Sequence, residues 1–184
     1  MDGNPVSDGI CETILRTCID NVPKAIANPE DDDARAALML ASSFGCSGLL
    51  ALGRTPSPWP GHGIVHEFSA FHDITHGVGL AIITPHWVRY SLTDKTLPRF
   101  VQYGVKVWDL DSADDPMTIA REAIDRMADF FASIGIARRL SDVGVTDEYF
   151  EAMADHLPTC WFDLQGALRP IDKAGILAIL RASL

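Results

Sequence analysis

Apolar residues recur every three or four positions along most of this chain, and no run alternates apolar with polar residues long enough to predict a β-strand. An amphipathic helix binds its neighbours through its apolar stripe, so a set of such helices forms a bundle. We therefore predict an all-α fold, a multi-helix bundle. The predicted helices cover residues 8–22, 33–52, 62–71, 75–91, 96–107, 114–134, 147–156 and 173–183.

Local signals refine the first two helices. Ser7 is a suitable N-cap for the first, and Pro23 is expected to kink or divide it. The second helix has a long apolar pattern and ends at Gly53, and it is predicted to be buried and closely approached by other helices. Its small residues are Ala41, Ser42, Ser43, Gly45 and Gly48. The proline-rich segment 54–61 is predicted to be an ordered connecting loop.

Size and charge limit the class of protein. A length of 184 residues with 47% hydrophobic and 22% charged residues is typical of one folded domain, which we place over residues 1–184. The formal charge of −10 argues against nucleic acid or an anionic membrane as a partner, because binding to phosphate groups needs clustered Lys and Arg. A small uncharged substrate remains compatible with this composition.

The cysteines and the apolar runs predict a cytoplasmic location. Cys11, Cys18, Cys46 and Cys160 form no CxxC pair, which is typical of reduced thiols. The first residues show no basic and apolar leader. The most apolar segment, 77–88, is interrupted by a proline and is shorter than the ~20 residues that cross a bilayer.

Four of the six histidines fall within fifteen residues, at positions 62, 66, 72 and 76. His62 and His66 are four residues apart and share a helix face, and His76 can return toward them from the next helix. Imidazole is the commonest protein ligand of transition metals, so His62 and His76 are candidate ligands of Fe²⁺ or Zn²⁺. A catalytic site normally takes three or more protein ligands, usually including a carboxylate, so this pair is half of a site.

The other histidines allow two interpretations each. His66 either moves a proton to or from a substrate oxygen, or packs against its neighbours. His72 and Asp73 either orient a metal ligand or are simply polar surface groups. His86 and His156 are interpreted as structural.

Several other motifs are excluded or weak. Glu67 follows the second histidine, so the HExxH motif of zinc proteases is missing. GxGxxG and P-loop motifs do not occur, and we assign no cofactor-binding residue. Gly77 and Gly79 follow a histidine cluster and no strand, so close helix packing explains them at least as well as nucleotide binding.

The segment after His62, GIVHEFSAFHDITHGVGLAIITPHWVRY, strongly resembles the histidine-rich signature of the iron-containing alcohol dehydrogenases, in particular the butanol dehydrogenase branch. Supporting similarity covers residues 12–43, 97–110 and 169–184. In such enzymes a Rossmann-like N-terminal domain binds NAD(P), and an all-helical C-terminal domain of the dehydroquinate synthase-like type supplies most metal ligands. The resemblance covers only the helical domain and implies that the nucleotide-binding domain is absent here.

The resemblance also implies roles for individual residues. It places metal ligands at His62 and His76, and an active-site histidine near the substrate and nicotinamide at His66. The family supplies an aspartate and a further histidine, four residues apart, from a segment before residue 12. Asp2 and Asp8 have no histidine four residues later, so that half of the ligand set is missing from this sequence.

The implied reaction interconverts primary alcohols and aldehydes. A divalent metal polarises the oxygen while the nicotinamide of NAD(P) exchanges hydride with the carbon. Without its cofactor domain the chain alone is expected to be inactive, and its uncovered apolar surface is expected to drive homo-oligomer formation. Two alternatives remain: a non-catalytic helical oligomerisation module, and a sugar-phosphate lyase or synthase of the wider superfamily, which the segment 74–85 disfavours by resemblance.

Overall fold

The computed structural model describes residues 3–53, 59–159 and 164–184, and these three segments contain helices and no strand. The predicted all-α class is therefore confirmed over this part of the chain. The described segments contain eight α-helices: α1 (Pro5–Ala27), α2 (Asp32–Cys46), α3 (Pro60–His72), α4 (His76–Ser91), α5 (Leu97–Trp108), α6 (Pro116–Ser133), α7 (Phe150–His156) and α8 (Lys173–Ser183). Three short 3₁₀ turns accompany them: η1 (Leu49–Ala51), η2 (Ser141–Val143) and η3 (Leu157–Thr159).

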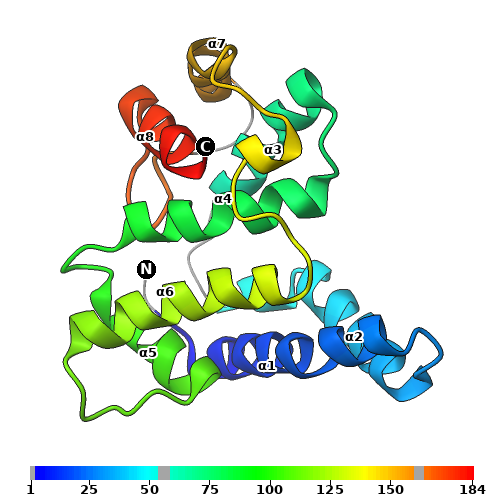
Figure 1. Cartoon of the computed structure of the whole chain (residues 1–184). Helices are drawn as coiled ribbons and strands as arrows, with labels where there is room; N and C mark the ends of the chain where they lie inside the picture. Colours follow the sequence, from blue (N-terminus) through cyan, green and yellow to red (C-terminus); the bar gives the residue numbers. More distant parts are fainter. Residues whose placement is uncertain (1–2, 54–58, 160–163) are drawn as a thin grey trace.

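Helix α4 lies in the middle of the bundle and joins its two halves (Figure 1). It packs against α6 on one side and against α3 and α8 on the other, while α1 packs against α2 and α5. The larger core lies among α3, α4, α7, α8 and the segments between α6 and α8, and includes the fully buried Val65, Phe68 and Ile83. A smaller core lies between α5 and α6. The histidine-rich segment therefore belongs to the larger core.

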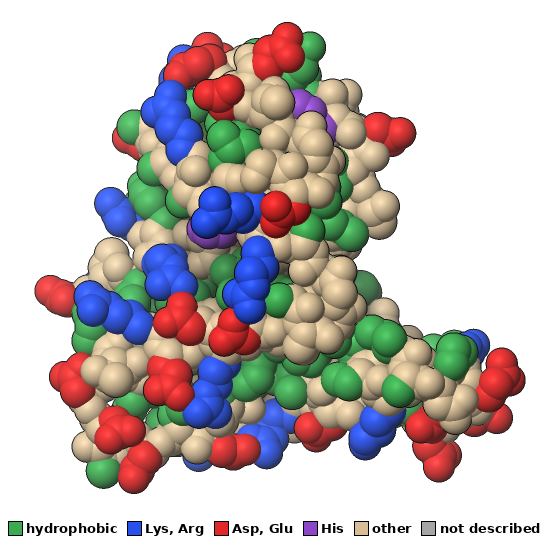
Figure 2. All heavy atoms as spheres, viewed as in Figure 1, with side chains coloured by type: hydrophobic (Ala, Val, Ile, Leu, Met, Phe, Trp, Pro, Cys, Tyr) green, Lys and Arg blue, Asp and Glu red, His purple; other side chains and the backbone are tan. Residues whose placement is uncertain are grey.

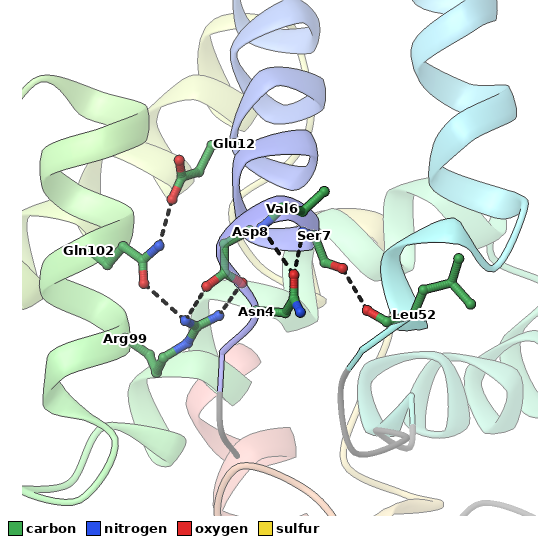
Figure 3. Close-up of polar contacts among 8 residues, drawn as sticks. All are labelled: Asn4, Val6, Ser7, Asp8, Glu12, Leu52, Arg99 and Gln102. Carbon is green, nitrogen blue, oxygen red and sulfur yellow. Dashed lines mark hydrogen bonds and ion pairs between the residues drawn. The ribbon is translucent and has the colours of Figure 1, made fainter.

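The N-terminus of α1 is held by a polar network that reaches two other parts of the chain (Figure 3). Asn4 caps the helix, because its side-chain oxygen accepts hydrogen bonds from the backbone N–H groups of Val6 and Ser7 at 3.0 and 3.3 Å. The prediction of Ser7 as the cap was wrong, since Pro5 already occupies the first helical position, where proline is favoured. Ser7 instead donates its hydroxyl to the carbonyl of Leu52 at 2.6 Å.

The same network ties α1 to α5. The Arg99 guanidinium donates to both oxygens of Asp8 at 2.7 and 2.8 Å, and also to Gln102 at 2.9 Å. Gln102 in turn donates to Glu12 at 2.7 Å. Asp8 is buried, so this bidentate ion pair is shielded from solvent more than an ordinary surface pair. Farther along α1, Pro23 lies inside the helix and does not divide it.

Helix α2 differs most from its prediction. It ends at Cys46, before η1, and only Ala34 and Ala41 are buried within it. Met39, Leu40 and Phe44 are 71%, 58% and 43% exposed. A Cβ atom added at Gly45 or Gly48 would meet no heavy atom within 4 Å, so the close approach expected there is missing. An apolar pattern identifies a surface that can be buried, but it does not supply the neighbour that buries it.

The remaining helices lie close to their predicted positions, and helix 173–183 matches residue by residue. Most of the predicted loop 54–61 lies outside the described residues, as does Cys160. Cys18 and Cys46 are free thiols. Within the described segments, none of the helices has the length and apolar character needed to cross a bilayer.

Candidate metal centre

A short connection folds α4 back along α3 and brings the histidine cluster together. Asp73 ends α3 with a left-handed backbone (φ 50°), and α4 begins three residues later at His76. Asp73 therefore has a backbone role in this turn, which neither of the two interpretations of the sequence included. The turn places the first residues of α4 beside α3, against which α4 packs.

A glycine sets how closely the two helices approach. A Cβ atom added at Gly79 would lie 2.8 Å from Cγ1 of Val65, well inside ordinary contact distance. Gly79 lies one helical turn after His76, and Val65 lies one turn after His62. The interpretation of Gly79 as a packing residue is confirmed, while Gly77 faces open space. The close contact therefore stands directly beside the histidines.

The structure brings three of the predicted site residues together. The ring centroids of His62 and His76 are 5.1 Å apart, and those of His66 and His76 are 4.9 Å apart. Trp59, which is 55% exposed, packs edge-on against His62 with a centroid distance of 4.8 Å. His72 stands at the other end of α3, about 15 Å from His62 by helix rise, and lies beside Tyr149 instead.

The electrostatics of His62 suit a metal ligand. Burial lowers the pKa of His62 below its usual value, and positive charge on His76 and His66 would lower it further. A lower pKa keeps the imidazole neutral at pH 7, and only a neutral imidazole nitrogen binds a metal ion. Burial and the neighbouring histidines therefore together favour the protonation state that a ligand needs.

The spacing of the rings provides a geometric test. Two imidazoles that bind one tetrahedral ion, each with a metal–nitrogen distance of about 2.1 Å, have ring centroids roughly 5 Å apart. The 5.1 Å between His62 and His76 agrees with that value, and so does the 4.9 Å between His66 and His76. Among the described residues, however, no group of three or more His, Cys, Asp or Glu side chains is arranged to hold a metal ion. The histidines fit part of a ligand set, and no other described residue completes it.

One further pair near the cluster was not anticipated from the sequence. Glu67, next to His66 in α3, is only 6% exposed, and both its carboxylate oxygens lie 3.0 Å from Nδ1 of His156. This contact joins α3 to α7 across 89 residues of sequence. Nothing in the local pattern indicates such a partner, because the pairing depends on how the two helices pack.

Comparison with known proteins decides the family. A family model described as "Fe-containing alcohol dehydrogenase family, C-terminal" matches residues 1–184. The chain belongs to this family. The resemblance of the histidine-rich segment and the predicted C-terminal helical fold are thereby confirmed.

Known dehydrogenases and reductases match most or all of the chain. NADH-dependent butanol dehydrogenase A of Clostridium acetobutylicum is 45% identical over 183 residues, which is 100% of this chain and 47% of the relative. The NADPH-dependent aldehyde reductase YqhD of Escherichia coli is 33% identical over 153 residues, covering 83% of this chain and 38% of the relative. The chain thus spans about half the length of the relatives it matches.

Solved structures of this family show the same fold. The butanol dehydrogenase A of Thermotoga maritima superposes with a TM-score of 0.89 at 24% identity, over 99% of this chain and 47% of that one. The substrate- and cofactor-free form of YqhD from E. coli gives a TM-score of 0.88 at 28% identity, over 97% of this chain and 46% of that one. The bundle in Figure 1 is therefore the helical part of a larger family fold.

Proposed function

We propose that this chain is the helical, metal-binding half of an NAD(P)-dependent dehydrogenase that interconverts primary alcohols and aldehydes. The observation that carries the proposal is the convergence of His62, His66 and His76 in a chain of the iron-containing alcohol dehydrogenase family. The names of the relatives support the substrate class, since they include butanol dehydrogenases and an aldehyde reductase. The same names include both NADH and NADPH as cofactors.

We assign His62 and His76 to one divalent ion, Fe²⁺ or Zn²⁺, and the remaining ligands to residues outside this chain. A bound divalent ion supplies Lewis acidity to a substrate oxygen. The ring centroid of His66 lies 4.9 Å from that of His76, and His66 shares a face of α3 with His62. His66 can therefore donate a proton to that oxygen or accept one from it. Trp59 shields one edge of His62 from water.

The cofactor-binding half lies outside this chain in the proposal, because the described helices offer no strand edge for a dinucleotide. We place the reaction in the cytoplasm because the four cysteines are scattered along the sequence without a CxxC pair. The assignment of residues 1–184 to a single metal-binding domain remains a prediction.

A zinc titration tests the metal assignment. Calorimetry of the purified chain with Zn²⁺ is expected to give weak binding, because two imidazoles without a carboxylate form half of a site. His62→Ala and His76→Ala should each remove it. His86→Ala, a histidine on the same pair of helices but outside the cluster, should leave it unchanged. Equal binding by wild type and His62→Ala would contradict the assignment.

A separate assay tests the catalytic part. The chain with Fe²⁺ or Zn²⁺, NADPH and butanal is expected to show no steady fall in absorbance at the nicotinamide band, because it lacks the cofactor-binding half. Sustained turnover above a no-protein control would show that the 184 residues suffice.

The exposed apolar face of the early helices favours a second role, self-association of the chain. Its exposed side chains are Val6, Leu15, Ile26, Met39, Leu40, Phe44 and Leu52. Exposed apolar side chains of this kind are often covered by a partner, and we propose a second copy of this chain. Light scattering at tens of micromolar should give a dimer or larger oligomer, which Met39→Lys with Leu40→Gln shifts to monomer. A wild-type monomer would contradict this role.

A further inference from the structure

A second cleft lies beside α4, away from the histidine cluster. It has a volume of about 640 Å³ and lies between α4, α6, the segment after α6 and the end of α8. Its volume falls in the range of pockets that hold small organic ligands. Figure 2 shows Lys and Arg side chains gathered across the middle of this face, over α4 and α6. The charges around this cleft distinguish it from the rest of the surface.

Four of the fifteen Lys and Arg residues of the chain line this one cleft, namely Arg89, Arg138, Arg139 and Arg181. Two acidic side chains, Asp125 and Asp129, line it with them, and Arg181 also pairs with Glu151 at 3.2 Å. The cleft is therefore locally positive in a chain whose formal charge is −10. The arginines come from three segments far apart in sequence, so folding alone creates this cluster.

The arginines have partners that an anionic ligand can replace. Arg89 donates to Asp125 at 2.6 Å, and Arg138 donates to Asp129 at 2.7 Å. All four of these side chains are about half exposed or more, and such ion pairs contribute little free energy. Within the described residues, the guanidinium of Arg139 makes no ion pair with an acidic side chain. Its five N–H donors are available to a ligand.

The floor of the cleft adds apolar contacts and one neutral donor. Ile82, Pro85 and Phe131 line it from α4 and α6. Burial lowers the pKa of His86, and the nearby charges of Arg89 and Arg139 lower it further. A neutral imidazole carries one N–H group that can donate to an anion. A basic rim over an apolar floor fits a ligand with an anionic group and an apolar body.

We propose that this cleft binds a small organic phosphate, with the phosphate among Arg89, Arg138 and Arg139 and the apolar body against Phe131. Several guanidinium groups around one cleft match a dianion with three acceptor oxygens better than a single carboxylate. Arg89 lies thirteen residues after His76, about 20 Å along α4. The proposal is therefore independent of the metal centre and of the dehydrogenase function.

Calorimetry with phenyl phosphate in a low-chloride buffer tests the proposal on the 184-residue chain. We expect saturable binding with a Kd below about 1 mM, and binding about tenfold weaker, or ~1.4 kcal/mol, for Arg139→Gln and for Arg89→Gln. Arg35→Gln is the matched control, because Arg35 is also exposed and donates only to the carbonyl of Pro29. Its affinity should equal that of wild type.

Two further ligands test the contributions of the phosphate charge and of the apolar body separately. Benzoate, with the same ring but a single charge, should bind more weakly, and inorganic phosphate should bind more weakly because it lacks the apolar body. In proton NMR, phenyl phosphate should shift the ring resonance of His86, assigned with His86→Asn, and leave that of His76 in place. No binding up to about 10 mM, an equal loss in Arg35→Gln, or a shift confined to His76 would overturn the proposal.

Discussion

Substitution of Gly79 by alanine should disturb the packing that holds the histidines together. The added Cβ atom would lie 2.8 Å from Cγ1 of Val65, about 0.6 Å short of ordinary contact. Val65 is completely buried and has little room to move. The strain must therefore be relieved by rotating the Val65 side chain against its neighbours or by separating α3 from α4.

The expected change in the free energy of unfolding of Gly79→Ala combines two opposing effects. Alanine is favoured over glycine inside a helix by about 1 kcal/mol, and the extra methyl group in a packed core costs about 1–3 kcal/mol. Gly77→Ala in the same helix carries only the first effect, because its Cβ atom would meet nothing within 4 Å, so the difference between the two variants isolates the second. We expect Gly79→Ala to be less stable than Gly77→Ala by about 1–3 kcal/mol.

Urea denaturation followed by circular dichroism measures the free energy of unfolding of each variant. Zinc calorimetry measures whether the substitution changes metal binding by the histidines. Gly79→Ala should weaken zinc binding, since a shift of a few tenths of an ångström at the contact changes the separation of His62 and His76. Gly77→Ala should leave it close to wild type. If the two variants differ by less than about 0.5 kcal/mol and bind zinc equally, the close contact does not set the helix spacing.

Two other predictions concern ionisable groups. Asp8→Asn should cost about 2 kcal/mol in urea denaturation, because it leaves the guanidinium of Arg99 without its bidentate partner, whereas Glu122→Gln in the exposed pair with Arg126 should cost less than about 1 kcal/mol. Because the pKa of His86 is lower in the folded chain than in the unfolded one, the unfolded chain takes up the proton first, and stability should fall as the pH drops below 6.5. His86→Asn should reduce that slope, and an unchanged slope would contradict this origin.

The helices were predictable where the chain carries its own boundary signals. Helix 173–183 begins after Asp172, whose side chain accepts a hydrogen bond from Gly175, and its buried residues follow the helical period. The cap of α1 was misplaced by three residues because two capping residues, Asn4 and Ser7, flank Pro5. Asn4 is the cap because Pro5 favours the first helical position, and because the Ser7 hydroxyl donates to Leu52 instead.

The candidate metal centre was predictable only in part. The spacing of His62 and His66 on one helix face follows from helix geometry, whereas the approach of His76 depends on the turn at Asp73 and on the packing of Gly79. The pair of Glu67 with His156 was missed, because no local pattern joins residues on different helices. The exposure of α2 was missed for the same reason, since its apolar side chains Met39, Leu40 and Phe44 lack a covering neighbour in the described structure.

The arginine cleft shows why net charge constrains a partner only weakly. Interactions between exposed charges are largely screened beyond about 8 Å at physiological ionic strength, so a bound anion responds mainly to the charges that line its own cleft. Those charges are four arginines and two aspartates, although the whole chain carries −10. The overall charge slows the approach of an anion from a distance, but it does not decide binding. Raising the salt concentration should therefore weaken phenyl phosphate binding, because salt screens the attraction between the phosphate and the arginines. Binding that does not change with salt would mean that the apolar floor alone provides the affinity.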